Sequence, residues 1–209
     1  MKLDKEQQKQ LINEIYAASR RRGYKKRSNT IYKIDNNALI HCDFLVVNSQ
    51  KLVYLINIKH YDYDDIFWKI MQMPTNSKEA VSLRAVGAFK APSIILKMEE
   101  IELTDNYKEH AEYLAELVDE CSRNFMERYD IDEYIIKCEN GMNRNILKCL
   151  AYIHMNNIEQ AVKIAKNAIK DGDSGGFMNE GKTFFEWMLD IKGGIVSPKD
   201  LSDHISCNN

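Results

Sequence analysis

The sequence predicts an α+β protein: an N-terminal helix, an antiparallel meander of three to five strands, and a C-terminal helical bundle. Apolar residues recur at helical spacing up to Gly23, alternate at strand spacing over residues 29–61, and return to helical spacing after residue 104. The first strands are joined by short connections, which require antiparallel neighbours because parallel pairing needs a long crossover. A sheet with helices gathered on one side or at one end belongs to the α+β class.

The first element is a helix over residues 4–22. Its inward-facing positions share one face at i, i+4 and i+8 spacing, namely Leu11, Ile12, Ile15, Tyr16 and Ser19. Asp4 is a suitable N-cap, and Gly23 supplies the left-handed conformation that closes many helices.

Strands are predicted over residues 29–35, 38–48 and 51–61, with turns at Asp-Asn-Asn and Asn-Ser-Gln. Within the third strand, residues 52–56 are apolar on both faces, which is typical of a mid-sheet strand covered on both sides for part of its length. A short helix over residues 63–73 ends at Pro74. Residues 83–89 and 93–103 are interpreted as two more strands, although residues 77–85 also fit the start of a helix.

The rest of the chain is predicted to be helical. Thr104 is the expected N-cap of a helix with 4-3-4 apolar spacing, through Tyr107, Ala111, Leu114, Val118, Cys121 and Phe125. Asp132 is expected to cap a short helix through Cys138. Two helices flank Asn156-Asn157, and a last one ends at Gly193-Gly194. The expected domains are an α+β domain over 1–103, a helical region packed on it over 104–194, and a frayed tail over 195–209.

Composition favours a cytoplasmic protein. The hydrophobic share is 44% and the charged share 29%, and the longest purely apolar run, residues 52–56, is far shorter than a membrane span. Residues 2–10 are almost wholly polar and charged, so we expect no secretory leader. The five cysteines are scattered without a Cys-x-x-Cys pair, so we expect reduced, mostly buried thiols and no metal knuckle. No dinucleotide, phosphate-loop or nucleophile-elbow motif occurs, and no cofactor is expected.

The segment Ser19–Thr30 packs six cations into a chain whose net charge is -2. Three arginines fall in the last helical turn, where the helix dipole favours cations, so a solvated helix end explains half of the cluster. The alternative is a surface that binds an acidic partner or a polyanion. The candidate binding residues are Arg20, Arg21, Arg22, Tyr24, Lys25, Lys26 and Arg27.

Weaker candidates for chemistry lie at the end of the third strand. If the strand continued, His60, Asp62 and Asp64 would share one face and could ligate a divalent metal. A strand end followed by a helix N-cap explains the same residues. His41-Cys42-Asp43 contains a base beside a nucleophile, but adjacent strand residues point to opposite faces, so His41 and Cys42 cannot pair directly.

The helices on either side of Asn156-Asn157 resemble a single tetratricopeptide-type hairpin. Small and aromatic residues occupy its characteristic positions, at Cys149, Tyr152, Ala161 and Ala168. Only one such unit is visible, and a peptide-binding solenoid needs about three repeats. The resemblance therefore implies a packing element.

A second resemblance covers the first hundred residues. A helix running into Gly23-Tyr24-Lys25-Lys26, the strand start Asn29–Tyr32 and the stretch Leu83–Phe89 resemble a bacterial group catalogued as domain of unknown function 4304. The resemblance implies a fold and a bacterial source. It implies no catalytic residue.

The favoured hypothesis is a cytosolic bacterial protein that binds another protein, in its narrower form an immunity protein that neutralises a toxin. It rests on the lack of catalytic motifs and on charge segregation between residues 19–30 and the acidic stretches 62–65 and 99–102. One alternative is nucleic-acid binding, with Tyr24 stacked on a base. Another is a metal-dependent hydrolase using His60, Asp62 and Asp64. Enzymatic activity is the less favoured reading, and no membrane partner is expected.

Overall fold

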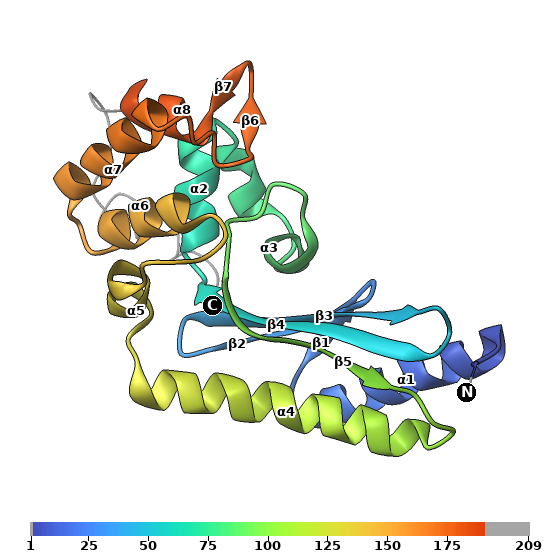
Figure 1. Cartoon of the computed structure of the whole chain (residues 1–209). Coiled ribbons are helices and arrows are strands. Elements are labelled where there is room, and N and C mark those ends of the chain that lie inside the picture. Colours follow the sequence, from blue (N-terminus) through green and yellow to red (C-terminus); the bar gives the residue numbers. More distant parts are fainter. Residues whose placement is uncertain (1, 191–209) are drawn as a thin grey trace. The chain divides into compact units, whose positions relative to one another are not determined.

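A computed structural model describes residues 2–190 and confirms the α+β class, with a five-stranded antiparallel sheet and eight α-helices in that range (Figure 1). The chain divides into two compact units. The first, called the sheet unit, comprises Met1–Tyr61, Ala80–Ala88 and Ser93–Tyr129. The second, called the helical unit, comprises Asp62–Glu79, Phe89–Pro92 and, within the described part of the chain, residues 130–190.

The sheet follows the order of the chain, as a meander must. Its strands are β1 (Lys25–Arg27), β2 (Thr30–Asp35), β3 (Ala38–Val47), β4 (Lys51–His60) and β5 (Ile94–Glu102), each antiparallel to the next. Asn36 and Asn37 both adopt positive φ, the conformation that a tight hairpin requires and that asparagine tolerates. The three predicted strands of residues 29–61 are confirmed. The short edge strand β1 was not predicted.

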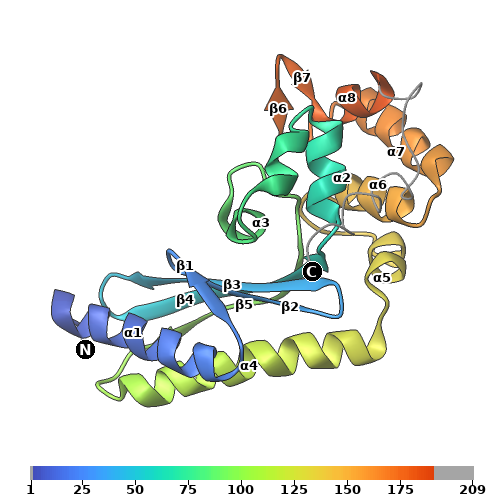
Figure 2. The same cartoon turned by 180° about the vertical axis from the view of Figure 1, so that it is seen from behind.

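Two helices cover one face of the sheet. Both cartoon views show α1 (Lys5–Arg21) and α4 (Tyr107–Arg128) along the same face (Figures 1 and 2). Strand residues under them are almost fully buried, including Ile40, Cys42, Leu52 and Ile56. Asp4 caps α1 in a capping box with Gln7, as the sequence predicts.

Two other predicted caps lie two residues from the observed ones. Asn106, not Thr104, caps α4 by accepting a hydrogen bond from the backbone N–H of Glu109. Asp130, not Asp132, caps α5 (Ile131–Lys137) by accepting from the N–H of Glu133 at 3.0 Å. Both segments offer two polar residues close together, and the spacing alone does not decide between them.

The prediction of a strand over residues 83–89 is wrong, because Ser82–Val86 forms the short helix α3. The N–H of Gly87 donates to the carbonyl of Leu83 at 2.8 Å, which closes a helical turn. That turn buries Ala85 against Tyr32 and Leu39 on the face of the sheet opposite α1 and α4. A single helical turn and a short strand both fit an apolar run of this length.

The helical unit is built around aromatic side chains. Its elements are α2 (Tyr63–Ile70), the 3-10 helix η1 (Pro74–Lys78), α5, α6 (Arg144–His154), α7 (Ile158–Lys170), the hairpin β6 (Met178–Asn179) and β7 (Lys182–Thr183), and α8 (Phe184–Asp190). Phe67 of α2 stacks on Phe184, with ring centroids 5.4 Å apart, and meets Phe177 edge-on. The predicted helix pair around Asn156-Asn157 is confirmed as α6 and α7, with Cys149 and Ala161 both fully buried.

The observed units differ from the expected division at residues 103 and 104. Helix α4 packs with α1 and the sheet, while residues 62–79 join the C-terminal helices. The reason is that compact units gather by packing of apolar faces, and the α4 seam faces strands that precede it in the chain. The predicted end of the last helix at Gly193 and the tail over 195–209 lie outside the described residues.

No helix within residues 2–190 combines the length and the apolar character that a membrane crossing needs.

Candidate functional site

The basic segment Ser19–Thr30 divides into a helix end and a strand. Gly23, with a φ of 83°, ends α1 in the left-handed conformation, and Lys25 begins β1. The chain therefore turns sharply in the middle of the cation cluster. Arg21 and Arg22, before the turn, lie beside α4, and the cations after the turn lie on the edge of the sheet.

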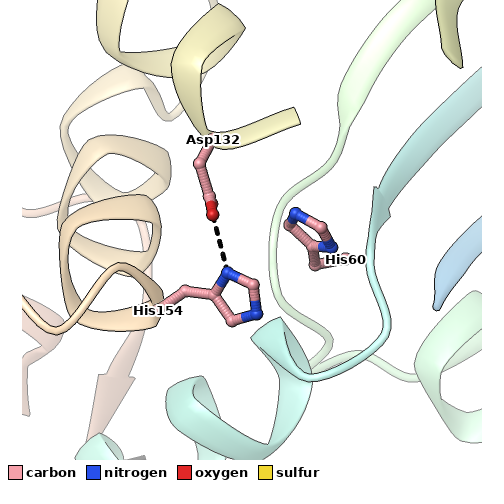
Figure 3. A group of neighbouring side chains, drawn as sticks. All are labelled: His60, Asp132 and His154. Carbon is pink, nitrogen blue, oxygen red and sulfur yellow. Dashed lines mark hydrogen bonds and ion pairs between the residues drawn. The ribbon is translucent and has the colours of Figure 1, made fainter. Parts of the chain in front are cut away.

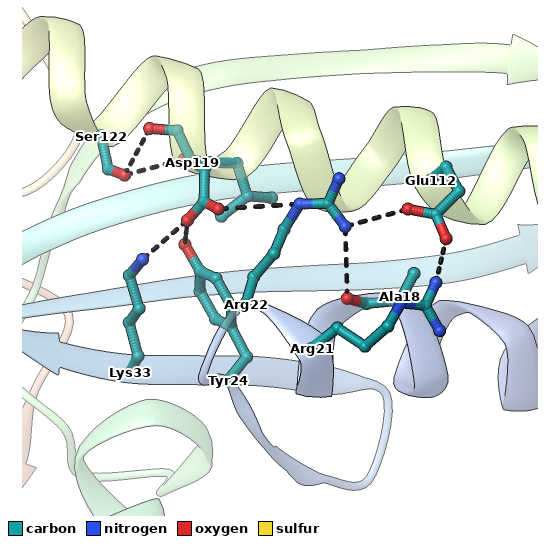
Figure 4. Close-up of polar contacts among 9 residues, drawn as sticks. Ala18, Arg21, Arg22, Tyr24, Lys33, Glu112, Asp119 and Ser122 are labelled. Carbon is teal, nitrogen blue, oxygen red and sulfur yellow. Dashed lines mark hydrogen bonds and ion pairs between the residues drawn. The ribbon is translucent and has the colours of Figure 1, made fainter.

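The arginines at the helix end are held by two carboxylates of α4 (Figure 4). Arg21 pairs with Glu112, and Arg22 donates to the other oxygen of Glu112 at 2.9 Å. Arg22 also lies 3.7 Å from Asp119. The hydrogen bond from Arg22, together with the charge of both arginines, lowers the pKa of Glu112.

Asp119 collects two further donors from the sheet unit. The Tyr24 hydroxyl donates to it at 2.9 Å and the Lys33 ammonium at 2.7 Å. Burial and the neighbouring carboxylate raise the pKa of Tyr24, which keeps the phenol protonated as a donor. The ring is only 4% exposed. The hypothesis that Tyr24 stacks on a base requires an exposed ring, and the structure buries it instead.

The cations of β1 are arranged differently. Lys25, Lys26 and Arg27 are all exposed, and none of them forms an ion pair with any described residue. Lys26 lies over the Tyr16 ring at 4.1 Å, a contact that orients its ammonium without neutralising it. β1 pairs only with β2, so it is an edge strand. We call these three residues the basic edge. Arg20 is likewise exposed, on the last turn of α1.

The three residues of the predicted metal site do not share a strand face. β4 ends at His60, Asp62 holds the N-cap position of α2, and Asp64 lies on α2 itself. Asp64 is fully buried and accepts a hydrogen bond from the backbone N–H of Ala91 at 2.8 Å. A shared face would require the strand to continue through Asp64, but β4 ends at His60 and α2 begins at Tyr63. The alternation on which the metal hypothesis rests is therefore absent.

His41 and Asp43 do share a face, as the strand alternation predicts. The imidazole Nδ1 lies 3.4 Å from Asp43, which also accepts from the Thr30 hydroxyl at 2.5 Å. Cys42 points to the opposite face and is fully buried there, and burial raises the pKa of its thiol. A protonated, inaccessible thiol is a packing residue, not a nucleophile.

The helical unit contains a polar group that sequence reasoning missed. Asp132 on α5 accepts a hydrogen bond from Nδ1 of His154 on α6 at 2.6 Å (Figure 3). Its other oxygen accepts from the hydroxyl of Tyr63 on α2 at 2.5 Å. The Tyr63 and His154 rings also meet edge-on, with centroids 5.8 Å apart. Tyr63 lies 69 positions from Asp132 in the chain, and His154 lies 22 positions from it. No spacing rule connects these residues.

This group orients one imidazole. The 2.6 Å contact between Nδ1 and the Asp132 carboxylate fixes the plane and direction of the His154 ring. The hydrogen bond to Asp132, opposed by partial burial, raises the pKa of His154. Such a pair can hold an imidazole for proton transfer, but it equally well joins two helices, and no reaction follows from it by itself.

Comparisons of this chain with models of protein families, with curated proteins and with solved structures find no match. The resemblances to the domain of unknown function 4304 group and to a tetratricopeptide hairpin therefore stay predictions. The class that the fold itself defines is an α+β protein with a five-stranded meander and a partly neutralised basic cluster.

Proposed function

We propose that this chain is a cytoplasmic protein-binding protein whose basic edge, Lys25, Lys26 and Arg27, receives an acidic surface of another protein. The observation that carries the proposal is the contrast within one charged run. Arg21 and Arg22 are paired with Glu112 and Asp119, whereas the cations of the basic edge have no such partner among the described residues. Exposed like charges at one place steer a partner of opposite charge and select against others.

In its narrower form the proposal makes the partner a toxin that this chain neutralises. Fast, charge-steered association suits an inhibitor that must reach its target before damage occurs. An edge strand also offers unpaired backbone groups, so an acidic segment in extended conformation could add to the sheet beside β1.

Nucleic-acid binding is the second candidate, and the structure weakens its support. Arg20 and the three cations of the basic edge could contact phosphates, but Tyr24 is not available for stacking, and Arg21 and Arg22 are already paired. A dependence on salt alone does not separate the two candidates, because both are electrostatic.

A third role for the basic edge needs no partner. Short edge strands carrying lysine are a common protection against sheet-to-sheet aggregation. Under that role, loss of the charges leads to aggregation of the isolated protein. Under the proposal, it leads to loss of binding by a protein that stays monodisperse.

The test is a triple variant, Lys25→Gln, Lys26→Gln and Arg27→Gln. A matched control removes three exposed lysines of α7 instead, at Lys163, Lys166 and Lys170. The binding probe is the protein encoded beside this chain's gene, with an oligoaspartate peptide and a DNA duplex as simpler polyanions. Calorimetry at several salt concentrations measures affinity, and co-expression measures protection of cells from the neighbouring gene product.

We expect the triple variant to lose at least about tenfold in affinity for an acidic protein, while the α7 control stays close to wild type. Preference for the duplex over both acidic polypeptides would replace the proposal by the nucleic-acid alternative. Equal losses in the two triple variants would show that total charge matters and not the basic edge. If co-expression of the unmodified chain does not protect the cells, the immunity form of the proposal is wrong, and the broader proposal of protein binding is unaffected.

A further inference from the structure

A serine of the sheet unit lies against His41. Ser93 comes directly before β5, and its Oγ lies 3.2 Å from Nε2 of the imidazole. On the other side of the ring, Nδ1 lies 3.4 Å from the Asp43 carboxylate. All three residues belong to the sheet unit. A hydroxyl, an imidazole and a carboxylate therefore follow one another in the order in which a serine hydrolase uses them.

The two distances are compatible with proton transfer. A nucleophile and its base lie about 2.6–3.2 Å apart in such sites, and these contacts are often longer until a substrate binds. The Asp43 carboxylate is itself anchored, because the Thr30 hydroxyl donates to its other oxygen at 2.5 Å. Thr30 is buried, so this anchor is shielded from water. The carboxylate is thus held beside the ring, which is the task of the third member of a triad.

The imidazole lies in a buried polar part of the sheet. His41 is 1% exposed, and its partner on β4, Asn57, is 4% exposed. Lys59, two residues further along β4 and on the same face, is fully buried. Burying polar side chains costs free energy, so their concentration at one place is a feature of functional sites as well as of structural networks. Ser93 is only half-buried, so the nucleophile belongs to a residue that keeps contact with solvent.

Apolar side chains lie on the same face of the sheet, beside these polar residues. Ile95 stands in the same row of paired residues as His41. Leu55 and Met98 stand in the row of Asp43. Ile95 is 45% exposed and Met98 69% exposed, and Leu55 is half-buried between the two rows. Paired side chains in a sheet lie about 5 Å apart, so these three apolar residues, which we call the apolar patch, adjoin the polar group. Exposed apolar surface of this kind marks an interaction site.

We propose that Ser93, His41 and Asp43 form a triad that hydrolyses esters with an apolar acyl chain, and that this chain lies on the apolar patch. The serine Oγ attacks the ester carbonyl carbon and gives its proton to Nε2, while Asp43 faces the proton on Nδ1. The imidazolium then protonates the alcohol as the bond between the acyl carbon and the alcohol oxygen breaks. Water attacks the acyl-serine with the same imidazole as base, which releases the carboxylic acid and restores the serine.

The inference goes beyond the proposed function, and either can fail alone because the basic edge takes no part in the triad. The first probe is a fluorophosphonate, which modifies activated serines covalently. Mass spectrometry of the digested full chain locates the modification, and we expect it at Ser93. A chain that stays unmodified, or that is modified only elsewhere, overturns the inference. This measurement needs no substitution, so it does not depend on the folding of a variant.

The second test follows hydrolysis of p-nitrophenyl acetate and p-nitrophenyl octanoate by the full chain. We expect Ser93→Ala and His41→Gln to lower kcat/KM at least about 100-fold, and Asp43→Asn at least about tenfold. The matched control is Ser77→Ala, at an exposed serine of η1, and its kcat/KM should stay within about twofold of the wild type. Urea midpoints of the variants separate loss of activity from loss of fold. Hydrolysis that survives Ser93→Ala overturns the inference.

The apolar patch is tested separately, through the length of the acyl chain. Met98→Glu is expected to lower the ratio of kcat/KM for the octanoate to that for the acetate at least about tenfold, because only the longer chain reaches the patch. The control is Met178→Glu, at a methionine that is 60% exposed on β6. A ratio that Met98→Glu leaves at the value of the control overturns the assignment of the apolar patch to the acyl chain.

Discussion

Two neighbouring groups of cations, separated by Gly23, have opposite fates in this protein. Arg21 and Arg22 end a helix that lies against α4, and both meet a carboxylate there. Lys25 and Arg27 follow on a strand at the edge of the sheet and meet none among the described residues. A run that reads as one basic cluster is therefore two groups. Arg21 and Arg22 are paired with carboxylates of the same chain, although the Arg21 side chain stays 58% exposed, and we call them the internal group; Lys25 and Arg27 form the external one.

The difference shows that the course of the backbone determines whether a cation faces a carboxylate or the solvent. A helix places every third or fourth side chain on one face, so the end of α1 presents its arginines to a neighbouring helix. A strand at the edge has no neighbour on one side, and the charges of β1 stay in water. Counting charges along the sequence overestimates the surface that is available to a partner.

The largest difference between the two groups is expected when Asp119, the shared acceptor of the internal group, is removed. Asp119→Ala leaves Tyr24 and Lys33 without their carboxylate and leaves Arg22 with Glu112 alone, and Tyr24 is buried. We expect the free energy of unfolding to fall by about 2 kcal/mol, measured by urea titration.

Glu116→Ala, at an exposed position of the same helix, is the matched control for that substitution. Its effect is expected to stay within about 0.5 kcal/mol. A loss for Asp119→Ala no larger than that of the control would mean that the internal group contributes nothing to stability.

A direct comparison of the two groups uses one substitution at two positions. Arg22→Gln removes contacts with Glu112 and Asp119 and is expected to cost about 1 kcal/mol. Arg27→Gln removes no ion pair with a described residue and is expected to change stability by less than about 0.5 kcal/mol. Equal urea midpoints for the two variants would contradict the division of the cluster.

The smallest expected effect is a dependence on pH that belongs to the internal group alone. The arginine contacts lower the pKa of Glu112 from its ordinary value of 4.5, so the carboxylate adds stability that is present above pH 4.5. This contribution is lost as the pH falls through the lower pKa of the folded state.

Glu112→Gln should therefore be less stable than the wild type at neutral pH, with the difference closing in acid. Thermal unfolding at a series of pH values measures this convergence. Arg27→Gln serves as the control, since its difference from the wild type should stay constant over the same range.

The sequence was sufficient for the elements whose pattern is long. The alternation over residues 29–61 predicts β2, β3 and β4, and the seam from Tyr107 to Phe125 predicts α4. It was insufficient for short elements: β1 has three residues and α3 five, too few to show a period. Leu83–Val86 alternates well enough to suggest a strand, and only its packing against Tyr32 and Leu39 makes it a helical turn.

The polar contacts were beyond sequence reasoning for a different reason. Arg22 and Glu112 are 90 residues apart, and Asp132 and His154 come from separate helices. Such pairs follow from how helices pack, which no local spacing reports. A hint was available in α4, where Glu112 and Asp119 are spaced seven residues apart and so lie along one side of the helix.

Helix α2 of the helical unit is synthesised well before the helices against which it packs. Helix α2 carries Phe67 and Trp68, which are almost fully buried, and its packing partners α6 and α8 are translated much later. A nascent chain that has just completed the sheet unit thus displays large aromatic side chains with nothing to bury them. Cutting the gene after Tyr129 would make that transient state permanent, and such a fragment is expected to require a chaperone to stay in solution.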